Sequence, residues 1–504
     1  MGGDERPVDL AVIGGGITGA AVARDASLRG LSVVLFEKGD FSSGTTSKSS
    51  RLIHGGLRYL EGFHFRLVYE SLRERDWLSS RLPHLIRPVP ILIPVYRGGR
   101  RGMGKVWIGM RLYDFLARGK ETPRYGTLSM DEVARRVPGI RQEGLSGGAL
   151  FYDYQLPVPE RLVVENLLSA SGAGARVQNR AQVEGIGFEA GAFRLRVRDL
   201  LTGARGEAAA AAVVNATGPW ADRTRRLFGL HGEILYPTKG AHLVFPGVSP
   251  HALFTASPKD DRMFYILPLA GSLLVGTTDT AYPGDPDAVG ATDEDVVYLR
   301  ESAEEFLPGS SLFRSTPFFS YAGVRPLLRG KGATESHLPR KHGVFREGPG
   351  GRFLTVAGGK MTTFRKMAED AVDAACAALG RKGPCTSREA PFPGEIGGGK
   401  EAAEAFATSL SGRYGATSEL CRHLVSLYGR RAERVLEIAE ESPALAKPLS
   451  PHSPDIAAQV VLASREEWAR TPQDAVLRRM HLGITKNRGR EATPAVERLL
   501  ARLS

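Results

Sequence analysis

Long uninterrupted apolar segments are missing from this sequence of 504 residues. A helix that spans a membrane needs about 18 to 20 apolar residues in succession, and the nearest approach, residues 88–96, contains three prolines. The first seven residues are polar and include two acids, which is unlike a secretory signal peptide. These absences argue against a spanning or secreted protein, and we expect any membrane contact to be peripheral.

Cysteine is scarce. Only Cys376, Cys385 and Cys421 occur, and three irregularly spaced cysteines are unsuited to a disulfide framework or a zinc site. We therefore expect no bound metal and a reducing, cytoplasmic environment.

Acidic residues are outnumbered, with 55 Asp and Glu against 67 Lys and Arg and a formal net charge of +12. Such a balance favours an anionic partner, which can be nucleic acid, an acidic membrane surface or a phosphorylated small molecule. Nucleic-acid binding is typical of exposed aromatics interleaved with basic residues, whereas the aromatics here fall mostly inside apolar strand patterns. We therefore expect no nucleic-acid partner.

One segment concentrates positive charge beside apolar residues. Residues 97–105 are rich in Arg, Lys and Gly, and residues 106–116 follow as an amphipathic stretch. This juxtaposition suits an anionic lipid surface. It equally suits a solvated loop followed by a half-buried helix, and the sequence leaves the two interpretations open.

Glycine marks the strongest local motif. The apolar residues 8–13 run directly into glycines at 14, 16 and 19, the spacing that turns a strand sharply into a helix and lets backbone approach a pyrophosphate. A second apolar segment, residues 31–36, ends at Glu37, where a dinucleotide-binding unit needs a carboxylate for a ribose diol. The order of these features predicts that FAD or NAD binds near the N-terminus.

The length implies two or three domains. Short apolar runs at residues 242–245, 263–267 and 272–275 predict a second sheet, and residues 400–504 are rich in Ala, Leu, Glu and Arg at helical spacing. The fold class that we predict is α/β, with a Rossmann-like FAD-binding domain, a mixed or antiparallel substrate-domain sheet and an all-α C-terminal domain. We place the boundaries as an oxidoreductase core at 1–390, with FAD-binding segments at 1–80, 150–225 and 345–390 and substrate-binding parts at 81–149 and 226–344, followed by a helical domain at 391–504.

Five further motifs, taken in order, resemble a known family. They are residues 49–61 (SSRLIHGGLRYLE), 215–220 (NATGPW), 275–279 (VGTTD), 323–327 (GVRPL) and 358–366 (GGKMTTFRK). Together they closely resemble the FAD-dependent glycerol-3-phosphate dehydrogenases, which have a D-amino-acid-oxidase-like flavoprotein fold. The resemblance covers nearly the whole chain, including a helix pair of the C-terminal domain at residues 466–479.

The resemblance implies an enzyme that oxidises sn-glycerol 3-phosphate to dihydroxyacetone phosphate, passing a hydride to FAD and two electrons to a membrane quinone. It also implies a cytoplasmic location at the inner face of the cell membrane, and it leaves a homodimer open. Related oxidases, which pass electrons to molecular oxygen, generally carry an insertion that is missing between Val275 and Arg325, so a dehydrogenase is favoured over an oxidase. An alternative of another class is an FAD-containing RNA-modifying or RNA-binding protein.

The substrate carries a phosphate, whose oxygens guanidinium groups bind in pairs. The residues that match the family around the substrate are Arg58, Tyr59, Arg325, Arg340 and Lys360. Arg325 and Lys360 are also expected at the reacting centre. Alcohol oxidation needs a base, and a histidine suits that task. We prefer His242 to His54 as that base, although His242 could instead only orient the substrate.

The FAD itself is expected to contact separate segments. We assign Gly14, Gly16 and Gly19 to the pyrophosphate, Glu37 to the adenosine ribose, and Thr217 and Gly218 to the adenine half. The remaining expected contacts come from a hydroxyl-rich loop and the start of the last core helix: Thr45, Thr46, Ser47, Gly359, Lys360, Met361 and Thr362. A helix N-terminus aimed at the ring would stabilise the negative charge of reduced flavin.

Overall fold

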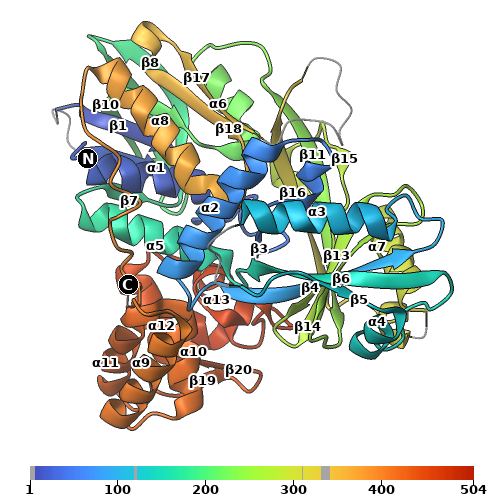
Figure 1. Cartoon of the computed structure of the whole chain (residues 1–504). Coiled ribbons are helices and arrows are strands. Elements are labelled where there is room, and N and C mark those ends of the chain that lie inside the picture. The colour runs from blue at the N-terminus through green and yellow to red at the C-terminus, as the bar shows by residue number, and fades with distance from the viewer. Residues whose placement is uncertain (1–5, 118–121, 309, 331–340, 504) are drawn as a thin grey trace.

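The computed structural model describes residues 6–117, 122–308, 310–330 and 341–503. Two large sheets stand beside each other, and a helical C-terminal domain lies against the end of the first sheet and the base of the second (Figure 1). The predicted fold class is confirmed, with a mixed second sheet and a helical C-terminal domain.

The first sheet is mostly parallel and has β1 near its centre. β1 pairs in parallel with β2 and β10, β2 with β7, and β10 with β18, while β17 is antiparallel to β18 and the β8–β9 hairpin extends from β10. The strands are β1 (Val8–Ile13), β2 (Val33–Phe36), β7 (Arg176–Gln178), β8 (Ala181–Glu189), β9 (Ala192–Asp199), β10 (Arg205–Asn215), β17 (His342–Glu347) and β18 (Phe353–Gly358).

Burial on both faces explains the continuous apolar runs of these strands. Helix α1 (Ile17–Leu28) contacts both α5 (Pro159–Gly172) and α8 (Phe364–Leu379), and these helices share one apolar core with β1 and β2. The parallel strands β1, β2, β10 and β18 end at the same edge of the sheet. Ligands of open α/β sheets bind outside that carboxyl edge, which is where Gly14, Glu37, Thr217 and Gly359 follow their strands.

The second sheet is antiparallel except for the parallel pairing of β12 with β4. Its strands are β3 (Leu52–Ile53), β4 (Arg87–Tyr96), β5 (Gly126–Leu128), β6 (Leu145–Gln155), β11 (Leu235–Pro246), β12 (Ala252–Ala256), β13 (Met263–Leu269), β14 (Ser272–Gly276), β15 (Thr280–Ala281) and β16 (Phe319–Leu328). The other helices of the core are α2 (Phe65–Arg81), α3 (Met103–Leu116), α4 (Met130–Arg136), α6 (Ala221–Leu227) and α7 (Asp293–Phe306).

The C-terminal domain packs six helices and one short strand pair. The helices are α9 (Gly399–Tyr414), α10 (Ser418–Tyr428), α11 (Ala432–Glu440), α12 (Ala457–Glu466), α13 (Pro472–Arg478) and α14 (Thr493–Leu500). Between α11 and α12, β19 (Pro448–Ser450) pairs antiparallel with β20 (Ser453–Ile456). Four prolines, at 443, 448, 451 and 454, fall in this segment, and proline prevents a helix from continuing there.

Within the part of the chain that the structure describes, no helix is both long enough and apolar enough to span a bilayer.

A buried ion pair joins the helical domain to the core. The Arg161 guanidinium on α5 donates to both carboxylate oxygens of Glu467, at 2.6 and 3.0 Å, and both side chains are completely buried. Arg431 donates to the same carboxylate. Burial acts to raise the pKa of Glu467, but the charges of Arg161 and Arg431 outweigh it and lower the pKa to about 2. Glu467 is therefore ionised in the folded protein, and the stabilisation it contributes is lost only as the pH falls below its unfolded pKa towards 2.

We predict that Glu467→Gln destabilises the holoenzyme by about 3–5 kcal/mol, because it leaves the buried Arg161 guanidinium without its carboxylate. The matched control is Glu441→Gln, whose ion pair with Arg465 is 42% exposed on both sides and should contribute little to stability. Urea unfolding followed by circular dichroism measures both. Equal losses from the two substitutions would contradict the role given to Glu467.

Candidate active site

A cavity of about 1030 Å³ lies at the carboxyl edge of the first sheet and continues to the second. Its wall includes the glycine turn after β1, the loop after β2, the turn after β10 and the segment after β18. The second sheet contributes residues of β11, β13 and β16. The volume is at the upper end of the range for small-molecule and cofactor sites.

The three motif glycines have different surroundings. Gly14 has φ +108°, and a Cβ there would lie 2.6 Å from the carbonyl oxygen of Ala216. A Cβ on Gly19 would lie 1.8 Å from the carbonyl oxygen of Gly14. At Gly16 the nearest atom to such a Cβ would be Thr46 Oγ1 at 3.5 Å, and Gly16 lines the cavity.

Gly14 thus makes the turn and Gly16 leaves room for a ligand beside the backbone. Gly19 does not line the cavity. Its missing side chain lets α1 pack on the end of β1, and its assignment to the pyrophosphate stays a prediction.

Glu37 ties the glycine turn to the loop after β2. Its Oε2 accepts a hydrogen bond from the Gly15 amide and its Oε1 one from the Gly39 amide, both at 2.7 Å. Burial raises the pKa of Glu37, and these two amides oppose that rise. Glu37 lines the cavity, and each carboxylate oxygen retains acceptor capacity for a ribose hydroxyl.

The hydroxyl groups of the predicted loop hold the loop itself. Thr45 Oγ1 donates to the Val324 carbonyl at 2.6 Å, Thr46 Oγ1 accepts from the Ile17 amide at 3.2 Å, and Ser47 Oγ donates to the Ser42 carbonyl at 2.5 Å. Thr45 and Thr46 line the cavity and Ser47 does not. The loop therefore connects the first sheet, the N-terminus of α1 and the second sheet.

The other predicted cofactor residues also line the cavity. Thr217 donates its hydroxyl to Asn215 at 2.7 Å, and Gly218 has φ +59°. Gly359, Lys360, Met361 and Thr362 follow β18. Thr362 Oγ1 accepts from the His54 amide at 3.1 Å and donates to the His54 carbonyl at 3.2 Å, so this segment is joined to the start of the second sheet.

These residues fit a dinucleotide cofactor. Helix α1 begins at Ile17 after the N-cap Gly16, which has no side chain to cap the helix, and its first residues line the cavity, so the positive end of its dipole faces a site suited to a pyrophosphate. Gly16 supplies the space that a Cβ would fill. FAD would be held there by Gly14, Gly16, Glu37 and the segment 359–362.

Arg325 is a fixed cation in the wall of the same cavity. Its guanidinium donates to Asp279 Oδ1 at 3.1 Å, to Thr277 Oγ1 at 2.9 Å and to the carbonyl of Thr278 at 3.1 Å, and its side chain is 23% exposed. These bonds hold the planar group in one orientation, as recognition of a phosphate requires.

Lys360 is the second cation of this wall. Its Nζ donates to Ser71 Oγ at 2.5 Å and lies 4.7 Å from the centre of the Tyr59 ring, which also lines the cavity. Arg58 does not line the cavity. Burial lowers the pKa of His54 to about 3, and the charges of Lys360 and Arg58 add to that shift. Arg340 lies outside the described residues.

His242 lies in β11 on the cavity wall. Its Nε2 is 2.8 Å from Ser50 Oγ, its ring stacks on Tyr321 at 5.0 Å between centroids, and its buried Nδ1 has no hydrogen-bond partner in the described part of the chain. Burial lowers the pKa of His242 to about 3, and the charges of Arg325 and Arg51 add to the shift. The imidazole is therefore neutral near pH 7 and has a lone pair that can accept a proton.

Several contributing residues had no role in the sequence-based prediction. Ser50 and Asp279 lie inside two of the quoted motifs, so the signal was present but their roles depend on their partners, His242 and Arg325. Tyr321 faces His242 only because β16 pairs with β11 in that register. Tyr265 of β13 also lines the cavity.

The comparisons with known proteins agree with this geometry. A sequence model described as FAD dependent oxidoreductase matches residues 9–365, and one described as C-terminal domain of alpha-glycerophosphate oxidase matches residues 385–503. The glycerol-3-phosphate dehydrogenase of Synechocystis sp. is 39% identical over 504 residues, covering 95% of this chain and 89% of the relative. This chain belongs to the FAD-dependent glycerol-3-phosphate dehydrogenase family.

Other relatives support the same membership. The aerobic glycerol-3-phosphate dehydrogenase of Bacillus subtilis is 35% identical, with 94% of this chain and 87% of that one covered. The crystal structure of the glycerol-3-phosphate dehydrogenase from Bacillus halodurans complexed with FAD superposes with a TM-score of 0.80 at 30% identity, covering 99% of this chain and 91% of that one. The family resemblance and FAD as cofactor are thereby confirmed, and the chain is an FAD-dependent oxidoreductase.

Substitutions of Gly16 and Gly19 should have different effects. We expect Gly16→Ala to fold normally but to raise the Kd for FAD at least about tenfold, or 1.4 kcal/mol, because its methyl group enters the cavity. Gly19→Ala should destabilise the apoprotein by about 1–3 kcal/mol, because its methyl group clashes with the Gly14 carbonyl. FAD titration by flavin fluorescence and thermal unfolding of the apoproteins separate the two effects. Unchanged FAD affinity in Gly16→Ala would contradict the assignment of Gly16.

Proposed function

We propose that this chain oxidises sn-glycerol 3-phosphate to dihydroxyacetone phosphate and passes the electrons to a membrane quinone. The observation that carries the proposal is that Arg325, Lys360 and the neutral His242 line the same cavity as the glycine turn of the dinucleotide site. Relatives named glycerol-3-phosphate dehydrogenase that match nearly the full chain support the substrate.

The phosphate of the substrate needs compensating charge. A phosphate monoester carries close to two negative charges near pH 7, and Arg325 and Lys360 supply two cations in the wall. The charge of Arg58 reaches the same region, as its effect on the pKa of His54 indicates. Arg325 and Lys360 therefore bind and orient the phosphate, with Tyr59 beside Lys360 as a hydrogen-bond donor.

The secondary alcohol must lose a proton and a hydride. FAD, when bound, supplies the acceptor for the hydride. His242 is the group to which we assign the hydroxyl proton, because it lines the cavity and its ring is held by Ser50 and Tyr321. Arg325 stabilises negative charge that develops on the substrate oxygen.

The electron acceptor distinguishes two candidates. The relatives are named glycerol-3-phosphate dehydrogenases, which supports a dehydrogenase, and a membrane quinone is the acceptor that we propose for it. The second candidate is an oxidase that reduces molecular oxygen to peroxide, and the match of residues 385–503 to an alpha-glycerophosphate oxidase domain favours it.

A quinone acceptor requires contact with a membrane, and one surface suits it. Phe63, Ile108 and Phe115 are 78%, 61% and 56% exposed. Helix α3 carries Ile108 and Phe115, and it contacts both α2 and the short helix Leu57–Leu60, the two elements that flank Phe63 in the chain. Exposed basic residues, among them Arg66, Arg73, Lys105 and Arg111, lie in the same elements. Apolar side chains bordered by positive charge match an anionic lipid interface, so we assign this surface to the inner face of the cell membrane.

The function is tested by adding sn-glycerol 3-phosphate to the oxidised holoenzyme without oxygen. Rapid bleaching of the flavin absorbance is expected, followed by fast re-oxidation with a soluble quinone and slow re-oxidation with air. Fast re-oxidation by air with release of peroxide would establish the oxidase instead. A bound flavin that glycerol 3-phosphate does not bleach would overturn the substrate assignment.

Arg325→Lys should raise the Kd for glycerol 3-phosphate at least about tenfold, because an ammonium cannot reproduce the charge-assisted hydrogen bonds of a guanidinium, which are worth about 1.5–3 kcal/mol. Arg329→Lys is the control, since Arg329 pairs with Glu233 at the exposed surface. The dependence of the bleaching rate on substrate concentration gives both constants. An unchanged constant for Arg325→Lys would remove Arg325 from the phosphate site.

His242→Asn should slow flavin reduction about 100-fold or more, because general base catalysis contributes a factor of this size. The control is His251→Asn, a half-buried histidine that does not line the cavity. Stopped-flow bleaching at saturating substrate measures the rate. If His242→Asn reduces its flavin as fast as the wild-type protein, His242 is not the base.

Membrane contact is tested by cosedimentation with vesicles that contain about one third phosphatidylserine. The double variant Phe63→Ser/Ile108→Ser should bind at least about tenfold more weakly, because burying one such side chain contributes about 1.5–3 kcal/mol. Val248→Ser is the control, being 79% exposed on a different loop. Equal binding by both variants would exclude this surface.

A further inference from the structure

The loop between β2 and β3 is held from outside the FAD-binding domain. This loop, residues 37–51, carries Glu37, Thr45 and Thr46 on the cavity side. Its opposite side contacts the C-terminal helical domain through Asp40 and Phe41. The two sets of contacts lie a few residues apart in the chain, so the helical domain can determine the conformation of the cofactor site.

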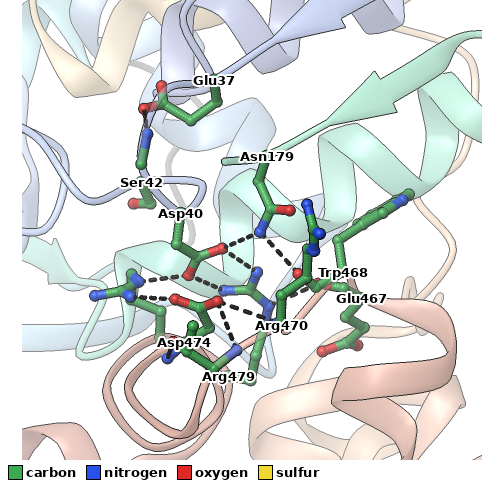
Figure 2. A network of polar contacts seen from close by, with 12 residues as sticks. Glu37, Asp40, Ser42, Asn179, Glu467, Trp468, Arg470, Asp474 and Arg479 are labelled. Atoms are coloured by element: carbon green, nitrogen blue, oxygen red, sulfur yellow. Dashed lines mark hydrogen bonds and ion pairs between the residues drawn. The ribbon is translucent and has the colours of Figure 1, made fainter. Parts of the chain in front are cut away.

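Asp40 is the centre of this contact. Its carboxylate is completely buried and accepts from both terminal nitrogens of Arg479, at 2.7 and 2.9 Å. Arg478 Nε donates to it at 2.5 Å and Asn179 Nδ2 at 2.9 Å. Figure 2 shows Asp40 between Asn179 and Arg479, below Ser42 and Glu37. Burial acts to raise the pKa of Asp40, but the two arginine charges lower it to about 2, so the carboxylate is ionised.

Further contacts hold the arginine side of the network. Arg479 Nε donates to the Glu467 carbonyl at 3.0 Å, and Asn179 Nδ2 donates to the Trp468 carbonyl at 2.7 Å. The Trp468 ring meets the Phe41 ring edge to face at 5.7 Å. Charge, amide and aromatic contacts therefore reach two successive residues of the loop.

Phe41 and the next residue, Ser42, both contact the glycine turn. A Cβ on Gly15 would lie 2.5 Å from the Phe41 ring, so the ring packs on the backbone of Gly15. The Ser42 amide donates to the Gly15 carbonyl at 3.0 Å, and the Gly15 amide donates to Glu37. Phe41 therefore contacts both the Trp468 ring and the turn that precedes α1.

The loop also adopts a conformation that needs support. Ser42 has φ +69°, which is unfavourable for a residue with a side chain and persists where surrounding contacts impose it. Asp40, Phe41 and the hydrogen bond from Ser42 to Gly15 supply these contacts. Without the helical domain the loop would lose the carboxylate bonds and the ring contact that hold residues 40 and 41.

We propose that the helical domain, through Arg478, Arg479 and Trp468, holds the β2–β3 loop in its FAD-binding conformation, so that FAD binding and docking of the helical domain stabilise each other. Asp40 and Arg479 are positioning residues that act on FAD through Phe41, Ser42 and Gly15. The coupling is reciprocal, because a ligand that favours the docked state is itself bound more tightly by that state. It concerns FAD only and is independent of the substrate and the electron acceptor.

The test measures the Kd of the full-length apoprotein for FAD by quenching of flavin fluorescence. Asp40→Asn and Arg479→Gln are each expected to raise this Kd at least about tenfold, and the double variant should be little worse than either, because the two residues form one interaction. Glu467→Gln is the matched control. It breaks a buried carboxylate–arginine pair of the same interface that does not contact the loop, so its Kd for FAD should stay within about twofold of wild type, while its stability falls.

Trp468→Leu is the milder variant, which removes the ring contact but no charge, and it should raise the Kd about threefold or more. It decides the question if the Asp40 and Arg479 variants do not fold. A wild-type Kd in Trp468→Leu, or an equal rise in Glu467→Gln, would overturn the proposal.

The reciprocal effect is measured by hydrogen exchange on the wild-type protein. The amides of α13, next to Arg479, should exchange faster in the apoprotein than in the holoenzyme, while the amides of α9, which packs against α10, should exchange at equal rates. Equal protection of α13 with and without FAD would contradict coupling.

Discussion

The close approach of α1 to the end of β1 is the contact on which the rest of the structure depends. Gly19 packs against the Gly14 carbonyl, which aims the first amides of α1 at the cavity. A cofactor with a pyrophosphate can then be bound by backbone rather than by side chains. The loop after β2, the turn after β10 and the segment after β18 all meet this point because parallel strands end at one edge.

Some basic side chains stabilise the fold through buried ion pairs, and others line the cavity. Arg75, Arg161 and Arg479 are among the largest fully buried side chains, and each is paired with a buried carboxylate. Such pairs specify how elements meet. Arg325 and Lys360 instead line the cavity, where burial lowers the pKa of His242 and His54 and the charges of these two cations add to the shift. A basic composition alone therefore does not indicate the substrate, and the phosphate recognition that we propose depends on the position of two cations beside the dinucleotide site.

Local sequence patterns predicted the first strand, the glycine turn, the second sheet and the helical domain, because burial and glycine spacing are local signals. Helix α2 extends to Arg81, and Ser79 and Ser80 donate hydrogen bonds back to carbonyls of its last turns. The motif resemblance pointed to the residues of the cavity. It did not give the partners of His242 or the Asp40 network, because these arise from residues far apart in the chain that meet only through strand register and domain docking.

The proposed function depends on recognition of a phosphate by two cations beside the dinucleotide site, Arg325 and Lys360. The most direct measurement is calorimetric titration of the oxidised holoenzyme with dihydroxyacetone phosphate and, separately, with dihydroxyacetone. We expect dihydroxyacetone phosphate to bind at least about 100-fold more tightly than dihydroxyacetone, a difference of about 2.7 kcal/mol. Equal affinities for the two compounds would contradict it.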